Sequence, residues 1–417
     1  MKIKRIKIEN LKSIESFELT CNENINVFLG LNGAGKSTIL QAISYCLSWY
    51  IARIKSTKSN GNIIGDKDIR LGASEAILSI EINNDISWTL IKQKKYSKLK
   101  TSNKSNFTEL TSYIESLLID GMPKFLPVIA FYGVNRVVSE IPSRFKSKHE
   151  LDVFSTYNDS LSAGANFRSF FEWFKEREDL ENERYRNDSS FEKDNQLEAV
   201  RKAIITILPQ YKDIRIQRNP REIIVTKDDK KFNIEQLSDG EKCYITLIGD
   251  IARRLAIANP LSDNPLSGEG IILIDEIELH LHPSWQTEVV SKLRSTFPNC
   301  QFFITTHSPL VVSEIRNFDD EKLIALQNGK EITSTKKPYG KTVESILNYY
   351  FNLNTVRNNE VQEKFDLLDS LLFENNYKSE KYDQAINWLK EHIGNNDKDI
   401  VVYQLEKEKR LQNEENK

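Results

Sequence analysis

Residues 30–37, GLNGAGKS, constrain this chain of 417 residues more than any other segment. They match the spacing GxxxxGK[ST] and lie between a short apolar run, residues 25–29, and a helical run, residues 42–52. Glycines in such a loop let backbone N–H groups and the N-terminus of the next helix point at a phosphate. The lysine reaches the β- and γ-phosphates, and the serine hydroxyl binds Mg²⁺. We therefore predict that ATP is bound by Asn32, Gly33, Ala34, Gly35, Lys36, Ser37 and Thr38.

A protein with such a loop needs a second, acidic strand that holds Mg²⁺ and organises the attacking water. Residues 270–276, GIILIDE, have this form, because an apolar run ends in Asp275 and Glu276. A strand that is apolar on both faces belongs in the middle of a parallel sheet. We predict that Asp275 holds the metal together with Ser37, and that Glu276 is the general base that polarises water.

The acidic stretch continues to His280 and His282, and a His-x-His spacing near carboxylates is also typical of zinc ligands. Zinc is therefore an alternative for this stretch. We favour magnesium, because Asp275 and Glu276 already have a role beside the phosphate loop and no further ligands cluster nearby in the sequence.

A further apolar strand, within residues 301–309 (QFFITTHSP), ends at His307. Ligands of open α/β sheets bind at the carboxyl ends of the strands. A single histidine is often structural, but this position favours a sensor of the γ-phosphate, so we assign His307 to the catalytic group.

Residues 237–242, LSDGEK, open another helical run and complete an ordered set of motifs. A phosphate loop, LSDGE, a strand ending in Asp-Glu and a later strand ending in His resemble the ATP-binding-cassette (ABC) ATPases. LSDGE is similar to their LSGGQ signature, with Asp239 and Glu241 as departures. The resemblance implies an α/β head with a mostly parallel sheet and an antiparallel β-subdomain. It also implies that Ser238 and Gly240 of one subunit close over the ATP of another, in a head-to-tail dimer or a larger assembly of dimers.

Three longer segments, residues 237–260, 264–286 and 297–315, resemble a narrower group of bacterial ATPases. This group is related to the overcoming-lysogenization-defect proteins and to the heads of RecF and SMC proteins. Within it the chain resembles the PtuA ATPases of Septu anti-phage systems and of Septu-type retrons, which also share the element FYGVNRVV, residues 131–138. The resemblance implies an HNH nuclease partner similar to PtuB. In a retron, it also implies a reverse transcriptase with its RNA–DNA product.

The motifs divide the chain into four expected parts. Residues 1–140 form the first half of the head and contain the β-subdomain, and residues 230–335 form the second half with the signature, the acidic strand and His307. Between them, residues 141–229 are expected to be a mostly helical insert whose phenylalanines, at 167, 170, 171 and 174, share one helical face. Residues 336–417 are expected to be a helical appendage for a partner or for oligomerisation, with a solvated, frayed charged end.

Charge and composition give only broad information on the partners and the cellular compartment of the chain. A net charge of −2 gives no global field for nucleic acid. The four cysteines lack CxxC spacing, which is typical of reduced thiols in a cytoplasmic protein. No apolar run approaches the roughly 20 residues that span a bilayer, so we expect no membrane partner.

The motifs predict a Mg²⁺-dependent ATPase, and the resemblance to PtuA implies that it acts as sensor and scaffold of an anti-phage complex and controls a nuclease partner. No nuclease centre is apparent in the sequence of this chain. A repair or recombination ATPase of the RecF/SMC type is the alternative. A transporter subunit is less favoured, because the region of Gly133, Asn135 and Arg136 offers no glutamine that could form a Q-loop.

Overall fold

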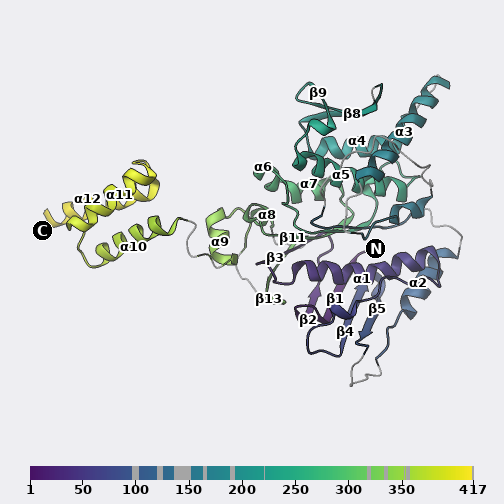
Figure 1. Cartoon of the computed structure of the whole chain (residues 1–417), viewed down its shortest axis with the longest axis horizontal. Helices are drawn as coiled ribbons and strands as arrows, with labels where there is room; N and C mark the ends of the chain where they lie inside the picture. The colour runs from purple at the N-terminus through teal and green to yellow at the C-terminus, as the bar shows by residue number, and fades with distance from the viewer. Residues whose placement is uncertain are drawn as a thin grey trace. The chain divides into compact units, whose positions relative to one another are not determined.

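The computed structural model of this chain describes two compact units, Met1–Ile346 and Leu347–Lys417 (Figure 1). Helix α9 (Val343–Phe351) contains the boundary between them, so the second unit begins later than the expected position 336. The described residues are 1–95, 103–119, 125–135, 152–162, 167–187, 193–219, 221–316, 321–332, 337–351, 353 and 357–415.

A six-stranded sheet forms the centre of the first unit, in the order β13-β12-β3-β11-β10-β6. Neighbouring strands run parallel except in the β12–β13 hairpin. Every residue of β3, β10 and β11 is buried, as their apolar sequences predict for central strands. The strands are β3 (Ile25–Gly30), β6 (Val128–Tyr132), β10 (Gly270–Ile274), β11 (Cys300–Thr306), β12 (Glu321–Gln327) and β13 (Lys330–Ile332).

A second, antiparallel sheet of four strands has the order β2-β1-β4-β5, which confirms the predicted β-subdomain. Its β4–β5 hairpin turns through Asn84 and Asp85, which both have positive φ, a conformation that Asn and Asp tolerate better than most residues. The strands are β1 (Ile3–Leu11), β2 (Ile14–Thr20), β4 (Glu75–Ile82) and β5 (Ile86–Gln93), and α2 (Thr108–Leu118) packs on β5.

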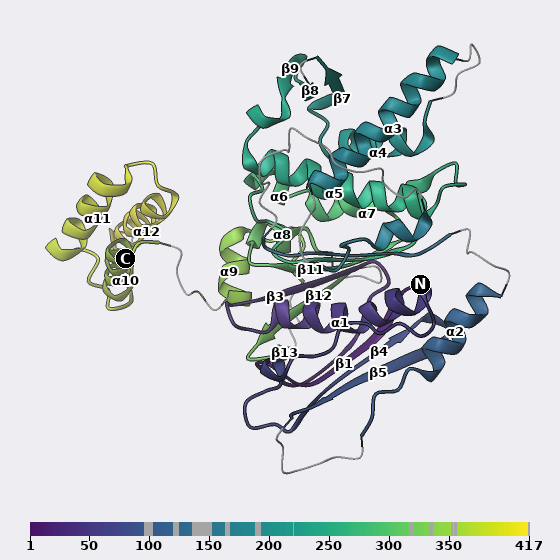
Figure 2. The same cartoon turned by 45° about the vertical axis from the view of Figure 1, so that its right-hand side comes forward.

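Helix α1 (Lys36–Lys55) lies between these two sheets and contacts strands of both (Figure 2). Most of its residues are buried, including Trp49 and Tyr50, as expected of a helix covered on two sides. Helix α5 (Asp239–Ala258) lies on the opposite side of the central sheet. The shorter helices α6 (Pro283–Gln286), α7 (Val289–Thr296) and α8 (Pro309–Glu314) complete the second half of the head.

The expected insert packs on α5 through α3 (Phe167–Asn187) and α4 (Asn195–Ile207). The predicted aromatic face is part of the core, because Phe170, Phe171 and Phe174 are fully buried. The Phe170 ring lies so close to α5 that a Cβ on Gly249 would come within 2.5 Å of it. The side chain of Phe167 and residues 141–151 lie outside the described part of the chain.

The insert also ends in a small antiparallel sheet, β7 (Tyr211–Arg218), β8 (Arg221–Lys227) and β9 (Lys230–Asn233), which the helical expectation missed. Ile214 and Ile216 alternate with charged residues along β7, which is the period of a strand buried on one face. The expected boundary at residue 230 falls at the start of β9.

The second unit is a set of three helices with a core of its own, α10 (Asn359–Phe373), α11 (Glu380–Ile393) and α12 (Lys398–Glu415). Helix α12 extends to Glu415, and the side chains of Gln412, Asn413 and Glu414 near its end are exposed. Arg410 donates to the Leu372 carbonyl at 2.7 Å, and Tyr377 donates to Glu414. These long-range polar contacts anchor the last turns of α12 to α10 and to the turn that follows it. Within the described ranges, no helix combines the length and apolar character needed to span a membrane.

A buried ionic cluster ties α5 to the edge of the central sheet. Asp250 is fully buried and accepts hydrogen bonds from Arg253, Arg254 and the Tyr132 hydroxyl of β6. Burial alone would raise the pKa of Asp250, but the two guanidinium groups hold it well below its usual range. Arg254 also donates to the carbonyl of Asn158 at 3.0 Å. The carboxylate is therefore the counter-charge of two buried cations.

Replacing Asp250 by Asn should destabilise the first unit strongly, because Arg253 and Arg254 would remain buried without their counter-charge. We expect a loss of about 3 kcal/mol in the free energy of unfolding. Urea titration followed by tryptophan fluorescence reports mainly on this unit, which contains four of the five tryptophans. The exposed Asp263→Asn variant is the matched control, and a loss below about 1 kcal/mol for Asp250→Asn would contradict a structural role for the cluster.

Candidate active site

The register of the central sheet brings the phosphate loop, the acidic residues after β10 and His307 to one edge. Ile274 of β10 lies beside Ile304 of β11, so the next residues, Asp275 and Thr305, are at the same level. Thr306 lies beside Leu29 of β3, which places His307 next to Gly30. The carboxyl ends of three parallel strands therefore meet where ligands of open α/β sheets bind.

The phosphate loop leaves β3 and enters α1 through two glycines with positive φ, Gly33 at 80° and Gly35 at 102°. A side chain at Gly35 would press on Ile14 and be strained in this conformation. Among the described residues, no side chain caps α1 and no acid lies in its first turn. The N–H groups and the dipole of this helix end fit an anion such as a phosphate.

Lys36 is buried beside the loop that it belongs to. Its Nζ donates to the carbonyls of Gly30 at 2.8 Å and Leu31 at 3.2 Å, and lies 2.8 Å from Nε2 of His307. An ammonium group has donors only, so the imidazole nitrogen accepts. Burial and then the Lys36 charge lower the pKa of His307, which keeps the ring neutral. Burial likewise lowers the pKa of Lys36, against the opposing effect of nearby carboxylates.

Ser37 and Asp275 are in direct contact, with the hydroxyl donating to the carboxylate Oδ1 at 3.0 Å. Thr305 donates to the same oxygen at 2.5 Å and accepts the backbone N–H of Glu276 at 2.7 Å. A hydroxyl and a carboxylate are oxygen donors of the kind that Mg²⁺ uses, with phosphate oxygens and water filling its other positions. The residues present therefore fit a magnesium ion bound with a nucleotide.

Sequence reasoning missed three residues that support this site, Thr305, Thr306 and Glu278. The Glu278 carboxylate accepts the backbone N–H of His307 and the Thr306 hydroxyl, the latter at 2.7 Å. The available signal in the sequence was two hydroxyl residues, Thr305 and Thr306, at the end of a mostly apolar strand and directly before His307. Glu276, by contrast, was predicted and lies at the start of the turn after β10 with a positive φ of 49°.

The signature residues begin α5 and contact the turn that follows β10. Ser238 is the N-cap of α5 and forms a capping box with Glu241. Gly240 leaves no room for a side chain, because a Cβ there would come within 2.1 Å of the His280 carbonyl oxygen. Within the described residues, no hydrogen bond joins Ser238 or Gly240 to the phosphate loop of the same chain.

The two histidines of the zinc alternative have separate surroundings. His282 is the N-cap of α6 and its Nδ1 lies 2.8 Å from the Ser284 hydroxyl, whereas His280 is exposed with a positive φ of 66°. The described parts of the chain hold no group of three or more His, Cys, Asp or Glu that could bind a metal. Gly133 and Asn135 follow β6, while Arg136 and the rest of the FYGVNRVV element lie outside the described residues.

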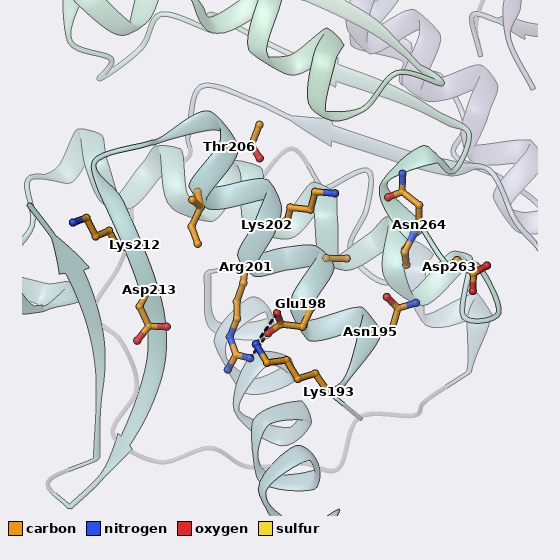
Figure 3. Close-up of a pocket in the computed structure, with 13 residues that line it drawn as sticks. Lys193, Asn195, Glu198, Arg201, Lys202, Thr206, Lys212, Asp213, Asp263 and Asn264 are labelled. Carbon is orange, nitrogen blue, oxygen red and sulfur yellow. Dashed lines mark hydrogen bonds and ion pairs between the residues drawn. The ribbon is translucent and has the colours of Figure 1, made fainter. Parts of the chain in front are cut away.

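A cavity outside this edge, of about 710 Å³, lies between α4, β7 and residues 263–265 (Figure 3). Side chains of both charge signs line it, including Lys202, Lys212, Asp213 and Asp263. None of the predicted site residues contributes to it.

Comparison with known proteins places the chain in a family. The family model described as "AAA domain, putative AbiEii toxin, Type IV TA system" matches residues 25–313. The "Retron Ec83 probable ATPase" of Escherichia coli is 32% identical over 99% of this chain and 87% of its own length. The "Septu protein PtuA" of Bacillus mycoides (strain KBAB4) is 29% identical over 84% of this chain and 44% of its own length.

Among solved structures, the SMC head bound to the C-winged helix domain of ScpA aligns with 81% of this chain and 99% of its own, at 16% identity and a TM-score of 0.48. The family match spans the phosphate loop, the signature, the acidic strand and His307. The chain therefore belongs to this AAA-domain ATPase family, in the group that contains the retron ATPases and Septu PtuA.

Proposed function

We propose that the chain hydrolyses ATP with Mg²⁺, using Lys36, Ser37, Asp275, Glu276 and His307. The observation that carries this proposal is the 3.0 Å contact between the Ser37 hydroxyl and the Asp275 carboxylate. It joins the phosphate loop to the acidic strand with the oxygen donors that a magnesium ion needs. When bound, the ion would neutralise charge on the phosphate oxygens, as in other proteins with this loop.

The remaining side chains divide the work of positioning and proton transfer. Lys36 supplies a buried cation at the loop, where the β- and γ-phosphates would lie. Glu276 polarises the attacking water and accepts its proton, with its backbone fixed by Thr305. His307 stands neutral beside Lys36 and senses the terminal phosphate, held by Glu278 through its backbone N–H.

We also propose that two copies share each site. Ser238 and Gly240 lie at the exposed start of α5 and form no hydrogen bond with their own phosphate loop, as far as the described residues extend. Such a helix start can serve the ATP of another subunit, because the N–H groups and the dipole of a helix N-terminus favour a nearby anion. The assembly would be a head-to-tail dimer or an oligomer of such dimers.

The relatives support a role in anti-phage defence, in a Septu or retron system. The chain would be the sensor and scaffold that couples its nucleotide state to an HNH nuclease subunit. In a retron, a reverse transcriptase and its RNA–DNA product would join the complex. Co-purification of the chain with the products of its neighbouring genes tests this part, and an assembly without a nuclease would contradict it.

Lys36→Ala should abolish measurable ATP binding, because it removes the cation that faces the phosphates. We expect affinity to fall by about a hundredfold or more in isothermal titration calorimetry. Lys202→Ala, which changes an exposed lysine of α4, is the control and should bind ATP normally. Equal affinity of Lys36→Ala and the unchanged protein would refute the phosphate-loop assignment.

Glu276→Gln should bind ATP with nearly unchanged affinity but hydrolyse it about a hundredfold more slowly, since it keeps the size of the side chain and removes the base. The slow turnover should accumulate ATP-bound dimers, which size-exclusion chromatography with light scattering detects. The exposed Glu288→Gln variant is the matched control. Normal phosphate release by Glu276→Gln would show that another group is the base.

A further inference from the structure

Glu241, which stands where the signature family has glutamine, contacts the signature serine through one of its two carboxylate oxygens. Oε2 accepts the Ser238 backbone N–H at 3.0 Å and the Ser238 hydroxyl at 2.9 Å. The hydroxyl oxygen in turn accepts the Glu241 N–H at 3.3 Å. The serine hydroxyl is therefore engaged as donor and as acceptor within its own chain.

The other carboxylate oxygen faces the small sheet of the insert. Oε1 accepts the Tyr211 hydroxyl of β7 at 2.7 Å and pairs with Nζ of Lys227 of β8 at 2.6 Å. Burial raises the pKa of the Glu241 carboxyl, but hydrogen bonds from Lys227, Tyr211 and Ser238 outweigh it and lower the pKa to about 2. The group is a carboxylate at neutral pH, and its charge is balanced from the sheet.

That sheet is itself anchored to the helical hairpin of the insert. The Ile216 N–H of β7 donates to Glu178 of α3 at 2.8 Å. Glu178 also pairs with Arg201 of α4 at 3.0 Å. The sheet that carries Lys227 and Tyr211 is therefore held in place by α3 and α4.

A serine hydroxyl has one proton to donate. While the Ser238 hydroxyl donates to Glu241, it cannot donate to a phosphate, and an unbalanced carboxylate beside it would repel that phosphate as well. Lys227 weakens both effects, because it draws the carboxylate charge toward Oε1. How readily Ser238 serves an incoming ATP thus depends on a residue of the insert.

We propose that Glu241 is a positioning residue that holds the Ser238 hydroxyl and yields it to the γ-phosphate of a partner subunit's ATP, and that Lys227 sets how readily it does so. This inference rests on the shared site proposed above. It makes the β7–β9 sheet a control point for subunit closure, and it gives the glutamate at position 241 of the signature a function.

The test measures ATP-dependent self-association of the full chain in the Glu276→Gln background, where ATP persists. Analytical ultracentrifugation gives the ATP concentration for half-maximal association. Lys227→Met should raise this concentration about fivefold, because the carboxylate loses its counter-charge. Glu241→Gln should lower it or leave it unchanged. The double variant should behave like Glu241→Gln, because without the carboxylate the lysine has nothing to balance.

Lys230→Met is the control, since Lys230 lies opposite Lys227 in the β8–β9 pairing and is exposed. Tyr211→Phe, which removes the other donor to Oε1, should act in the same direction as Lys227→Met and serves if that variant folds poorly. If the double variant needs as high an ATP concentration for association as Lys227→Met does, the proposed role of Glu241 is wrong, while the shared site still stands. If the Glu276→Gln protein, with no change in its signature or insert, does not associate when ATP is added, the shared site is wrong and this inference falls with it.

Discussion

The contact between the Ser37 hydroxyl and the Asp275 carboxylate joins two segments that are 238 residues apart in the chain. It forms because β3, β11 and β10 lie side by side and run parallel, which brings the carboxyl ends of β3 and β10 to one edge of the sheet. The first half of the head supplies β3 and β6, and the second half supplies β10, β11 and β12. The central sheet, the buried Asp250 cluster and the active-site edge therefore depend on the two halves interleaving. The β-subdomain and the insert form sheets of their own and do not interrupt the strand order of the central sheet.

Much of this architecture could be predicted from local sequence. The apolar runs of β3 and β10, the turn at Asn84 and the aromatic face of α3 are patterns contained within a few residues. The contacts of Thr305, Thr306 and Glu278 could not be predicted in the same way, because they follow from the register between strands. The β7–β9 sheet was missed because the alternation in β7 is clear only around Ile214 and Ile216, which is too short a pattern to identify a strand by itself. Helix α12 lies in the region that was expected to be helical, but its contact with the Leu372 carbonyl could not be predicted locally, because it joins residues far apart in the chain.

Gly240 belongs to the signature motif, and close packing also requires a glycine at this position. The His280 carbonyl approaches so closely that any side chain at position 240 would displace it. The start of α5 is thus packed against the turn that begins with Glu276. A subunit that presents Ser238 to a partner cannot move this helix start without disturbing the turn beside its own hydrolytic residues. Within each chain, the signature that would serve a partner's ATP is therefore packed against the turn that contains the hydrolytic residues of its own site.

Hydrolysis of each ATP between two subunits is the central claim, and mixed subunits test it most directly. Lys36→Ala lacks the phosphate-binding cation, and Ser238→Arg blocks the signature. Each alone should be inactive, whereas a mixture creates one site with an intact loop facing an intact signature. We predict that ATPase activity reappears on mixing and depends on the ratio of the two proteins. Full activity of Ser238→Arg alone, at concentrations where it is monomeric, would contradict the shared site.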